Sequence, residues 1–340
     1  MINYGVIGCG VISKVHCAAI EKEINSKLIT VCDIVPEKAN DLAKTYGCNA
    51  VYDYDEVLKD PNIDVITICL PHHEHYKLFK KSLAAGKHVL TEKPLGINFN
   101  DVSDMVKISE ATELKTTVAF QHRHSILVKA LKTYLDSGLF GDIKGGELEF
   151  HCTRDMDYYD SDEWRGKWAT EGGGTLINQA IHTVDLANLF LGCPLNVEGS
   201  IENRQHPKIE VEDYAQGSVI YKNSLLMLKA VNSNEKPWEP KLTINCLKGK
   251  FVLIGSDHLH SLELYDSNET EIIKKLTDIE NEMKQKEVSG KACYGSLHNL
   301  VFEDFTNSII NNTKPLMSIK EGAMANNIVL EFYKNRRGNL

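Results

Sequence analysis

The sequence has no long apolar run and no excess of basic charge. No apolar stretch approaches the roughly 18 residues that a membrane-spanning helix needs, so we expect no membrane segment. Lys and Arg number 38 against 47 Asp and Glu, which gives a formal net charge of -9. This acidic balance argues against a nucleic-acid partner, because such a partner favours a basic face. It does not exclude an anionic substrate, since one local basic pocket can bind an anion.

Paired cysteines are also absent. The nine cysteines are scattered singly, and none forms a CxxC pair. Isolated cysteines in odd number are typical of reduced thiols in a cytoplasmic protein, and this spacing predicts no zinc site. Strand-like residues begin almost at once, at Ile2, with no basic segment and apolar run before them. We therefore expect no secretory signal and predict a cytoplasmic location.

What the chain does contain is the composition of a globular protein with two domains. It has 340 residues, of which 42% are hydrophobic and 25% charged. A chain of this length exceeds one ordinary domain core. In the first 120 residues, strand patterns alternate with helical patterns, which predicts βαβ units and a parallel sheet. The expected strands are 3–8, 27–33, 64–70, 89–91 and 115–120, and the expected helices are 13–23, 36–46, 75–85 and 99–112.

A glycine turn between the first strand and the first helix is the first chemical signal. Gly8 permits a tight turn, and Gly10 lets the backbone approach a pyrophosphate at the helix N-terminus. Ser13 stands where a third glycine or alanine is usual, and it is small enough to keep the helix close to the sheet. Asp33 follows Gly10 by 23 residues, at the end of the second strand. There it can bind both ribose hydroxyls of NAD and repel the 2′-phosphate of NADP, or it can simply cap the second helix. We predict an NAD-binding Rossmann domain over residues 1–121.

The second half is different in kind, because strands there follow one another with short turns. This pattern predicts an α+β domain over residues 122–340 with a large, mostly antiparallel open sheet. One face of such a sheet needs a cover, and a second subunit would provide it. The expected strands are 144–151, 196–203, 214–221, 224–232, 241–246, 249–255 and 260–265, and the expected helices are 175–191, 299–311 and 319–335.

Three clusters carry candidate chemistry. Residues 91–94, Thr-Glu-Lys-Pro, end a parallel strand, where ligands of open α/β sheets bind. Residues 164–168, Trp-Arg-Gly-Lys-Trp, form a dense aromatic and basic run. Three glycines at 172–174 let the backbone pass close to another group. The helix that follows is expected to place Asn178, His182 and Asp185 on one face.

These segments carry a resemblance that spans essentially the whole chain. The chain resembles the glucose–fructose oxidoreductase, inositol dehydrogenase and rhizopine-catabolism family (Gfo/Idh/MocA). The matching segments are GCGVIS with His16, LPHHEH at 70–75, AGKHVLTEKP at 85–94, GGGTLINQAIHTVDL at 172–186, VEDYA at 211–215 and the C-terminal helical segment. The resemblance implies a Rossmann domain, a C-terminal domain with a large open sheet, and a homodimer or homotetramer.

The resemblance also implies catalytic roles. Lys93 resembles the lysine that hydrogen-bonds the reacting hydroxyl, and His182 the histidine that shuttles its proton during hydride transfer to nicotinamide. Many members have an aspartate four residues before that histidine, where this chain has Asn178, which cannot act as a base. The Asn-Gln-x-x-His variant resembles members that act on hexose-type and nucleotide-sugar substrates. The chemistry is sound in itself, because a neutral histidine suits proton removal near neutral pH and a lysine stabilises a developing alkoxide.

The predicted site divides into cofactor and substrate contacts. The cofactor contacts are Gly8, Gly10, Val11, Ile12, Asp33, Leu70, Pro71, His75, Glu92, Lys93, Gln121, Trp164 and Arg165. The substrate contacts are Lys93, Arg123, Asn178, His182 and Tyr158. Structural alternatives remain for several residues: Trp164 and Trp168 can belong to the core, and His182 can be a structural histidine. A metal cluster at His72, His73 and His75 is disfavoured, because they follow a strand end beside the predicted cofactor, and we predict no metal.

We therefore predict a nicotinamide-dependent dehydrogenase, with NAD favoured over NADP. Its substrate is a secondary hydroxyl or keto group of a sugar, sugar derivative or cyclitol. Two alternatives stay open at this point. One is a protein that holds NAD as a sensor or structural ligand without turnover, and the other is an enzyme with trapped NAD and no net cofactor change.

Overall fold

The protein divides into two compact units in a computed structural model that describes residues 1–233, 237–255, 258–265, 269–285 and 297–334. The first unit joins residues 1–121 to the later segment 288–323, and the second joins 122–287 to 324–340. Our prediction placed everything after residue 121 in the second domain, so the assignment of 288–323 differs from it. Among the described residues, no helix combines the length and the apolar character needed to cross a membrane.

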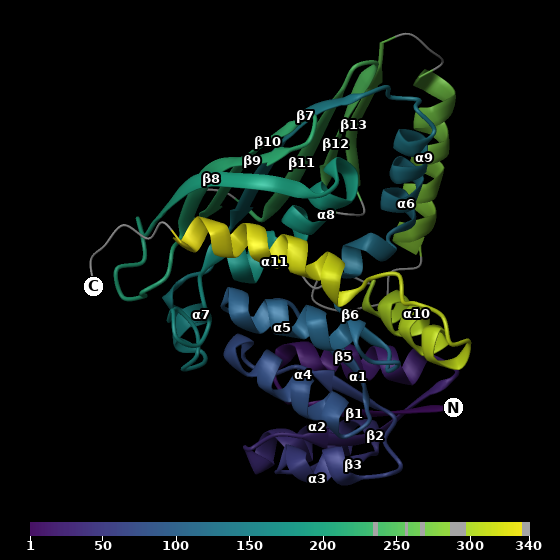
Figure 1. Cartoon of the computed structure of the whole chain (residues 1–340), viewed down its shortest axis with the longest axis vertical. Coiled ribbons are helices and arrows are strands. Elements are labelled where there is room, and N and C mark those ends of the chain that lie inside the picture. The colour runs from purple at the N-terminus through teal and green to yellow at the C-terminus, as the bar shows by residue number, and fades with distance from the viewer. Residues whose placement is uncertain (234–236, 256–257, 266–268, 286–296, 335–340) are drawn as a thin grey trace. The chain divides into compact units, whose positions relative to one another are not determined.

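The first unit contains a six-stranded parallel sheet (Figure 1). Its strand order, β3-β2-β1-β4-β5-β6, is that of the doubly wound dinucleotide-binding fold, and each neighbouring pair is parallel. The predicted parallel sheet is therefore confirmed. The sequence interpretation missed β3, because three residues, one exposed and two partly buried, show no alternating pattern. The strands are β1 Ile2–Ile7, β2 Ser26–Cys32, β3 Asn49–Val51, β4 Val65–Ile68, β5 His88–Thr91 and β6 Thr116–Val118.

Helices connect these strands and cover the sheet. All four residues of β4 are buried, as expected for a central parallel strand. Helix α2 begins with a proline and ends at Gly47, whose φ of 66° provides the left-handed C-cap that glycine adopts without strain. Short α3 was not predicted. The helices are α1 Val11–Lys22, α2 Pro36–Tyr46, α3 Tyr54–Lys59, α4 His75–Ala84 and α5 Phe99–Glu110, with 3₁₀ turns at His72–Glu74 and Gln121–His124.

Helix α10, His298–Ile310, returns from the far end of the sequence to complete the core of the first unit. It packs against α1, and its Phe302 and Phe305 belong to the same buried cluster as Tyr4. The Tyr4 and Phe302 rings lie 5.6 Å apart, and the Tyr4 hydroxyl is 2.7 Å from the Thr306 hydroxyl. The apolar pattern of α10 predicts a helix but not its partner, which is why the sequence alone did not connect it to the first unit.

The second unit contains a seven-stranded sheet in the order β13-β12-β11-β7-β10-β9-β8 (Figure 1). Strands β10 and β7 are parallel, and the other neighbouring pairs are antiparallel, which confirms the predicted mostly antiparallel sheet. The strands are β7 Ile143–Cys152, β8 Pro194–Glu202, β9 Tyr214–Tyr221, β10 Leu225–Asn232, β11 Glu239–Cys246, β12 Gly249–Ile254 and β13 His258–Leu264.

Helices cover one face of this sheet, and no helix of the described residues covers the other. Helix α8 contacts β7 and β11, while α9 contacts β13 and α6. Along β10, Leu226 and Leu228 are buried, whereas Leu225 and Met227 between them are exposed. Helices α6, α7 and α9 were not predicted. The helices are α6 Ile126–Asp136, α7 Met156–Asp160, α8 Ile181–Leu191, α9 Glu269–Gln285 and, from residue 324 onward, α11 Ile319–Lys334, whose first turn belongs to the first unit.

The cysteines agree with the prediction of reduced thiols as far as the structure describes them. Eight are free, and burial raises the pKa of most of these thiols, for example that of Cys9 to about 12. Cys293 lies outside the described residues. A buried thiol with a raised pKa is a poor nucleophile, so the buried cysteines act as small packing groups, whereas Cys193 is exposed.

Candidate functional site

The glycine turn between β1 and α1 fits a dinucleotide pyrophosphate. Gly8 has a φ of 97°, and a Cβ there would lie 2.4 Å from the carbonyl oxygen of Cys69, so no other residue fits. Gly10 is the N-cap of α1 and offers no side-chain cap, while a Cβ on it would have no neighbour within 4 Å. The first N–H groups of α1 are therefore open to an anion. Ser13 donates to the Gly10 carbonyl at 2.6 Å and thus braces the turn.

Asp33 lies directly after β2 and holds two backbone segments together. Its Oδ2 accepts a hydrogen bond from the Cys9 amide at 2.8 Å, and its Oδ1 accepts one from the Val35 amide at 2.9 Å. Val35 is the N-cap residue of α2, so the carboxylate does serve that turn. A carboxylate has about four acceptor positions, and two bonds leave capacity for the ribose hydroxyls of a nucleotide. The neighbouring Ile34 is 84% exposed and offers no positive charge to a 2′-phosphate.

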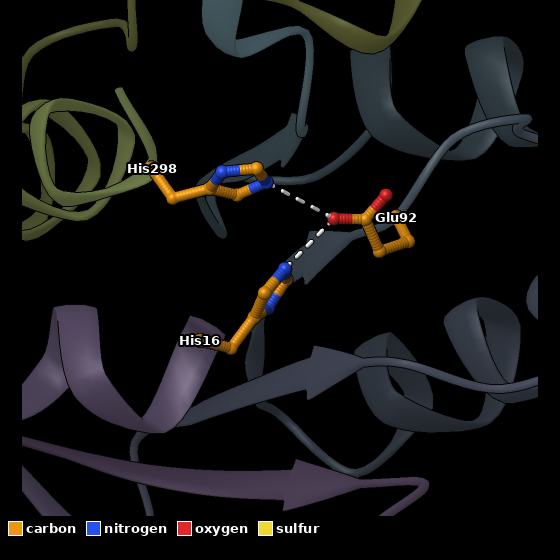
Figure 2. A group of neighbouring side chains, drawn as sticks. All are labelled: His16, Glu92 and His298. Carbon is orange, nitrogen blue, oxygen red and sulfur yellow. Dashed lines mark hydrogen bonds and ion pairs between the residues drawn. The ribbon is translucent and has the colours of Figure 1, made fainter. Parts of the chain in front are cut away.

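A buried carboxylate anchors the segment that carries Lys93. Figure 2 shows Glu92 between His16 of α1 and His298 of α10, with both imidazoles directed at one carboxylate oxygen. His16 Nε2 lies 2.8 Å and His298 Nε2 3.6 Å from Glu92 Oε1. The other oxygen, Oε2, accepts from the Lys93 amide at 3.2 Å. The backbone of Lys93 is thereby tied to two helices of the first unit.

The protonation states of this cluster follow from its surroundings. Burial alone would raise the pKa of Glu92, but the hydrogen bonds from His16 and His298 hold it well below its usual range. Burial lowers the pKa of His16 despite the attraction of Glu92. A neutral His16 donates from Nε2 to Glu92 and accepts at Nδ1 from the Thr67 hydroxyl, 2.8 Å away. Glu92 is thus an ionised, hydrogen-bonded group inside the protein.

Two imidazoles and a carboxylate are also groups that can bind a metal ion. Their donor atoms lie within 4.8 Å of one another. Two ligands of a tetrahedral zinc ion lie about 3.4 Å apart, since each bond is about 2.1 Å long. The 2.8 Å contact between His16 and Glu92 is shorter and fits a hydrogen bond. The sequence reading missed His298, because nothing in its local pattern connects α10 to Glu92.

His75 links the end of β4 to the segment after Lys93. Its Nδ1 lies 2.6 Å from the Pro94 carbonyl and its Nε2 2.8 Å from the Leu70 carbonyl, and the ring is fully buried. Our prediction made His75 a cofactor contact. The ring has no exposed surface to offer, so only the backbone of this residue could meet a cofactor. Leu70 and Pro71 are partly exposed and remain predicted contacts.

In the second unit, the three glycines lead the chain past a buried glutamate. Glu212 accepts hydrogen bonds from the amides of Gly174 at 2.6 Å and Leu176 at 2.9 Å, and from the Tyr333 hydroxyl at 2.8 Å. A Cβ on Gly174 would lie 2.0 Å from the Glu212 carbonyl oxygen. Burial raises the pKa of Glu212 to about 7. The sequence reading quoted this residue only as part of VEDYA and did not predict its role.

The helix that follows differs from the prediction. Residues Thr175–Ala180 form a π-helical turn before α8, so Asn178 does not share one regular α-helical face with His182 and Asp185. Asp185 instead binds Arg123 through two hydrogen bonds of 2.8 Å, Nε to Oδ2 and Nη2 to Oδ1. Both side chains are buried. Arg123 was predicted to bind substrate; the structure shows its buried ion pair with Asp185, and the substrate contact stays a prediction.

Asn178 lies beside a carboxylate that the sequence reading missed. Its Nδ2 donates to Glu171 Oε1 at 2.5 Å and to the Tyr158 hydroxyl at 3.0 Å. Glu171 is 1% exposed, and its Oε2 accepts from the Gly166 amide at 2.5 Å. Gln179 also donates to the Tyr158 hydroxyl, at 3.2 Å. Glu171 directly precedes the three glycines, and that position in the sequence could have indicated a role for it in the site.

Several predicted contacts gather around Tyr158. The Arg165 guanidinium carbon lies 4.3 Å from the centre of the Tyr158 ring and 4.5 Å from that of Trp164, and Arg165 Nη1 donates to the Tyr158 hydroxyl at 2.5 Å. Trp168 instead donates from its indole to the Glu210 carbonyl and packs on another tyrosine, which is a structural role. The His182 ring lies 5.2 Å from that of His122, within the second unit. Lys93 belongs to the first unit.

Comparison with protein families covers most of the chain. The family described as "Oxidoreductase family, NAD-binding Rossmann fold" matches residues 2–120, and the "GFO/IDH/MocA C-terminal domain" matches residues 128–252. Among curated proteins, oxidoreductase P35 of Formosa agariphila is 27% identical over 73% of this chain and 78% of its own length. Inositol 2-dehydrogenase of Rhizobium meliloti is 29% identical, but the match covers only 56% of this chain and 55% of that protein.

Solved structures share the fold over almost the whole chain. The WlbA dehydrogenase of Bordetella pertussis, in complex with NADH and UDP-GlcNAcA, superposes with a TM-score of 0.89 at 24% identity, covering 98% of this chain and 94% of that one. The WlbA dehydrogenase of Chromobacterium violaceum, with the same two ligands, gives a TM-score of 0.86 at 25% identity, covering 98% and 93%.

The raised pKa of Glu212 predicts a stability that depends on pH. A carboxyl with a pKa of about 7 in the folded chain and its usual value of 4.5 in the unfolded chain stabilises the fold below pH 4.5. This contribution is lost as the pH rises through 7. We expect the free energy of unfolding of the wild type, minus that of Glu212→Gln, to fall by roughly 2 kcal/mol from pH 5 to pH 7.5, because only the wild type loses this contribution. Urea unfolding of both proteins at the two pH values measures it.

Any constant cost of placing an amide at position 212 cancels in this comparison. Glu198→Gln is the matched control, because Glu198 is an exposed residue of β8; its difference from the wild type should stay flat over the same range. An unchanged difference for Glu212→Gln would contradict the raised pKa.

Proposed function

Since the chain belongs to the Gfo/Idh/MocA family of NAD-binding oxidoreductases, we propose that it moves a hydride between NAD and a secondary hydroxyl or keto group of a sugar, sugar derivative or cyclitol. The observation that carries the proposal is the first unit itself. It holds the open glycine turn and Asp33 at one strand end and the anchored Glu92-Lys93 segment at another. Carboxyl ends of parallel strands are where ligands of this fold bind.

The curated relatives support the substrate class. They include inositol 2-dehydrogenase, levoglucosan dehydrogenase and a dTDP-sugar 3-reductase of Streptomyces violaceoruber, which is 29% identical over 59% of this chain. Each of these names describes a dehydrogenase or reductase of a sugar, a cyclitol or a sugar derivative. We extend that class to this chain and leave the individual substrate open.

We assign the chemistry to Lys93 and His182. The ammonium group of Lys93 stabilises the alkoxide that develops as the hydride leaves, and Glu92 and His75 position its backbone. His182 removes the hydroxyl proton during oxidation and returns it during reduction. Bound NAD supplies the hydride acceptor at its nicotinamide ring, while the turn of Gly8 and Gly10, with Val11, Ile12 and Asp33 around it, holds the dinucleotide.

Removing either catalytic side chain should stop turnover without preventing cofactor binding. We expect Lys93→Ala and His182→Ala each to lower kcat by about 10²- to 10⁴-fold on the best substrate of a sugar and cyclitol panel, because each removes a positioned proton-transfer or charge-stabilising group. Absorbance at 340 nm measures turnover, and NADH fluorescence measures binding. Lys80→Ala is the control, since Lys80 is exposed and pairs with Asp104 on the surface. Full turnover by both variants would refute the assignment.

The same panel separates this function from its rivals. A sensor or structural NAD protein would give no absorbance change with any sugar, and mass analysis of the denatured protein would find either no NAD or NAD that never turns over. An enzyme with trapped NAD would release bound NAD on denaturation and convert its substrate without added cofactor. Either result would replace the proposal of an exchangeable cofactor.

We further propose that the cofactor is NAD rather than NADP, because Asp33 lies beside the glycine turn, bonded to the Cys9 amide. We expect NAD to bind at least about tenfold more tightly than NADP, because a carboxylate beside the ribose repels the 2′-phosphate. Asp33→Ser should weaken NAD binding and remove most of that preference, as titrations of fluorescence against each cofactor would reveal. Asp41→Ser, an exposed site on α2, should change neither value. Tighter binding of NADP by the wild type would overturn this part.

The open face of the second sheet supports a proposal of self-association as a homodimer or homotetramer. Leu225 is 43% and Met227 52% exposed on β10, in line with the alternation of the strand. An apolar pair on an open sheet face gains by burial against a second copy. We expect sedimentation velocity at micromolar concentration to give a multiple of 38.2 kDa, and Met227→Glu to shift it toward the monomer. A monomeric wild type would contradict the proposal.

A further inference from the structure

Arg154, in the second unit, carries a guanidinium whose surroundings are aromatic rather than acidic. It follows β7 by two residues, and its guanidinium carbon lies 4.7 Å from the centre of the Tyr158 ring and 5.1 Å from that of Trp238. The Asn232 side chain holds the Arg154 backbone through two hydrogen bonds. The Arg154 amide donates to Asn232 Oδ1 at 2.7 Å, and Asn232 Nδ2 donates to the Arg154 carbonyl at 3.1 Å. The cation is therefore held between two rings on an anchored base.

Arg154 differs from every other arginine in the described part of the chain. Arg123 pairs with Asp185, Arg165 with Asp162 and Arg204 with Glu202. Arg154 has no carboxylate partner and no side-chain hydrogen bond among the described residues, and its Nε is buried without an acceptor. Buried donors in proteins are nearly always satisfied, by the protein or by something bound to it. A half-buried cation without a partner is costly, so its retention points to a ligand of opposite charge.

The cation lies next to the predicted substrate contacts. Arg154, Tyr158, Asn178 and Gln179 line one small hollow of the second unit, together with Glu171. Arg154 stacks on the same tyrosine whose hydroxyl accepts from Asn178, four residues before His182. The carboxylate of Glu171 is the acidic group of this hollow, and its oxygens accept from Asn178 and from the Gly166 amide rather than from Arg154.

We propose that Arg154 binds an anionic group, a carboxylate or a phosphate, on the sugar substrate. This inference deepens the proposed function and rests on it: the substrate would be an acidic sugar, such as a uronic acid, or a phosphorylated or nucleotide-linked one, rather than a neutral polyol. A guanidinium presents paired N–H groups that match both anions. The two rings restrict its rotation, so little side-chain freedom remains to be lost on binding.

The experiment compares matched sugars that differ in charge. Isothermal titration of the NADH-loaded protein measures binding of D-glucose, D-glucuronate and D-glucose 6-phosphate, and of UDP-glucose and UDP-glucuronate. We expect at least one anionic member to bind about tenfold or more tightly than its neutral counterpart, since a charge-assisted hydrogen bond contributes that much. Glucuronate and the phosphate separate the two sources of charge, and the UDP pair tests a carboxylate when a diphosphate is present in both ligands.

The variants identify the residue responsible. Arg154→Gln should remove the preference for the anion and leave binding of the neutral sugar unchanged, while Arg154→Lys should keep part of it, because the charge remains but the paired N–H groups are lost. Arg204→Gln is the matched control, since it also removes one stacked arginine, but an exposed one. It should bind every ligand like the wild type.

The outcomes are separable from those of the proposed function. Equal binding of charged and neutral members, or no binding of any charged member, would overturn the role of Arg154. So would an Arg154→Gln variant that weakens both members equally, because that result indicates a structural role. Binding needs no hydride transfer, so an anion preference without any change at 340 nm would contradict the dehydrogenase and leave the anion site intact. Turnover of neutral sugars without such a preference would support the dehydrogenase and contradict the anion site.

Discussion

The first unit depends on one buried negative charge. Glu92 is ionised inside the protein because His16 and His298 donate to it, and without them burial would favour its protonated form. The same carboxylate accepts from the amide of Lys93. Helix α10 therefore does more than cover the sheet, since it brings the second histidine to the strand end (Figure 2). A helix from the far end of the sequence thus takes part in fixing the candidate catalytic lysine.

The second unit uses buried carboxylates in a related way. Glu212 accepts hydrogen bonds from amides of the glycine-rich segment, and Glu171 accepts them from the Gly166 amide and the Asn178 side chain. Each of these two carboxylates accepts hydrogen bonds from neutral donors. A buried acceptor that is left without a hydrogen bond costs free energy, so these donors fix the orientation of each carboxylate. The π-helical turn and the loop before it are held by these bonds.

The sequence predicts the repetitive parts of this fold well and the long-range contacts badly. Parallel and antiparallel sheets follow from local spacing, and the turn at Gly8 follows from a requirement that only glycine meets. By contrast, α9 has a charged surface and little apolar content, so its pattern did not indicate a packed helix. The roles of His298, Glu171 and Arg154 are set by contacts with residues far away in the chain, and no local pattern shows them. The π-helical turn was not predicted either. One inserted residue there changes the face of the helix on which Asn178 lies.

The departure at Asn178 has a physical reason in its neighbour. The resemblance leads to an aspartate at this position, but here Glu171 Oε1 lies 2.5 Å from the Asn178 amide nitrogen. An aspartate would place a second carboxylate oxygen against Glu171 in a buried setting, where two like charges cannot both stay ionised. The amide instead donates to Glu171 and to the Tyr158 hydroxyl. The carboxyl group beside this position is therefore that of Glu171, one hydrogen bond away from Asn178, and this leaves His182 as the group that our proposal needs for proton transfer.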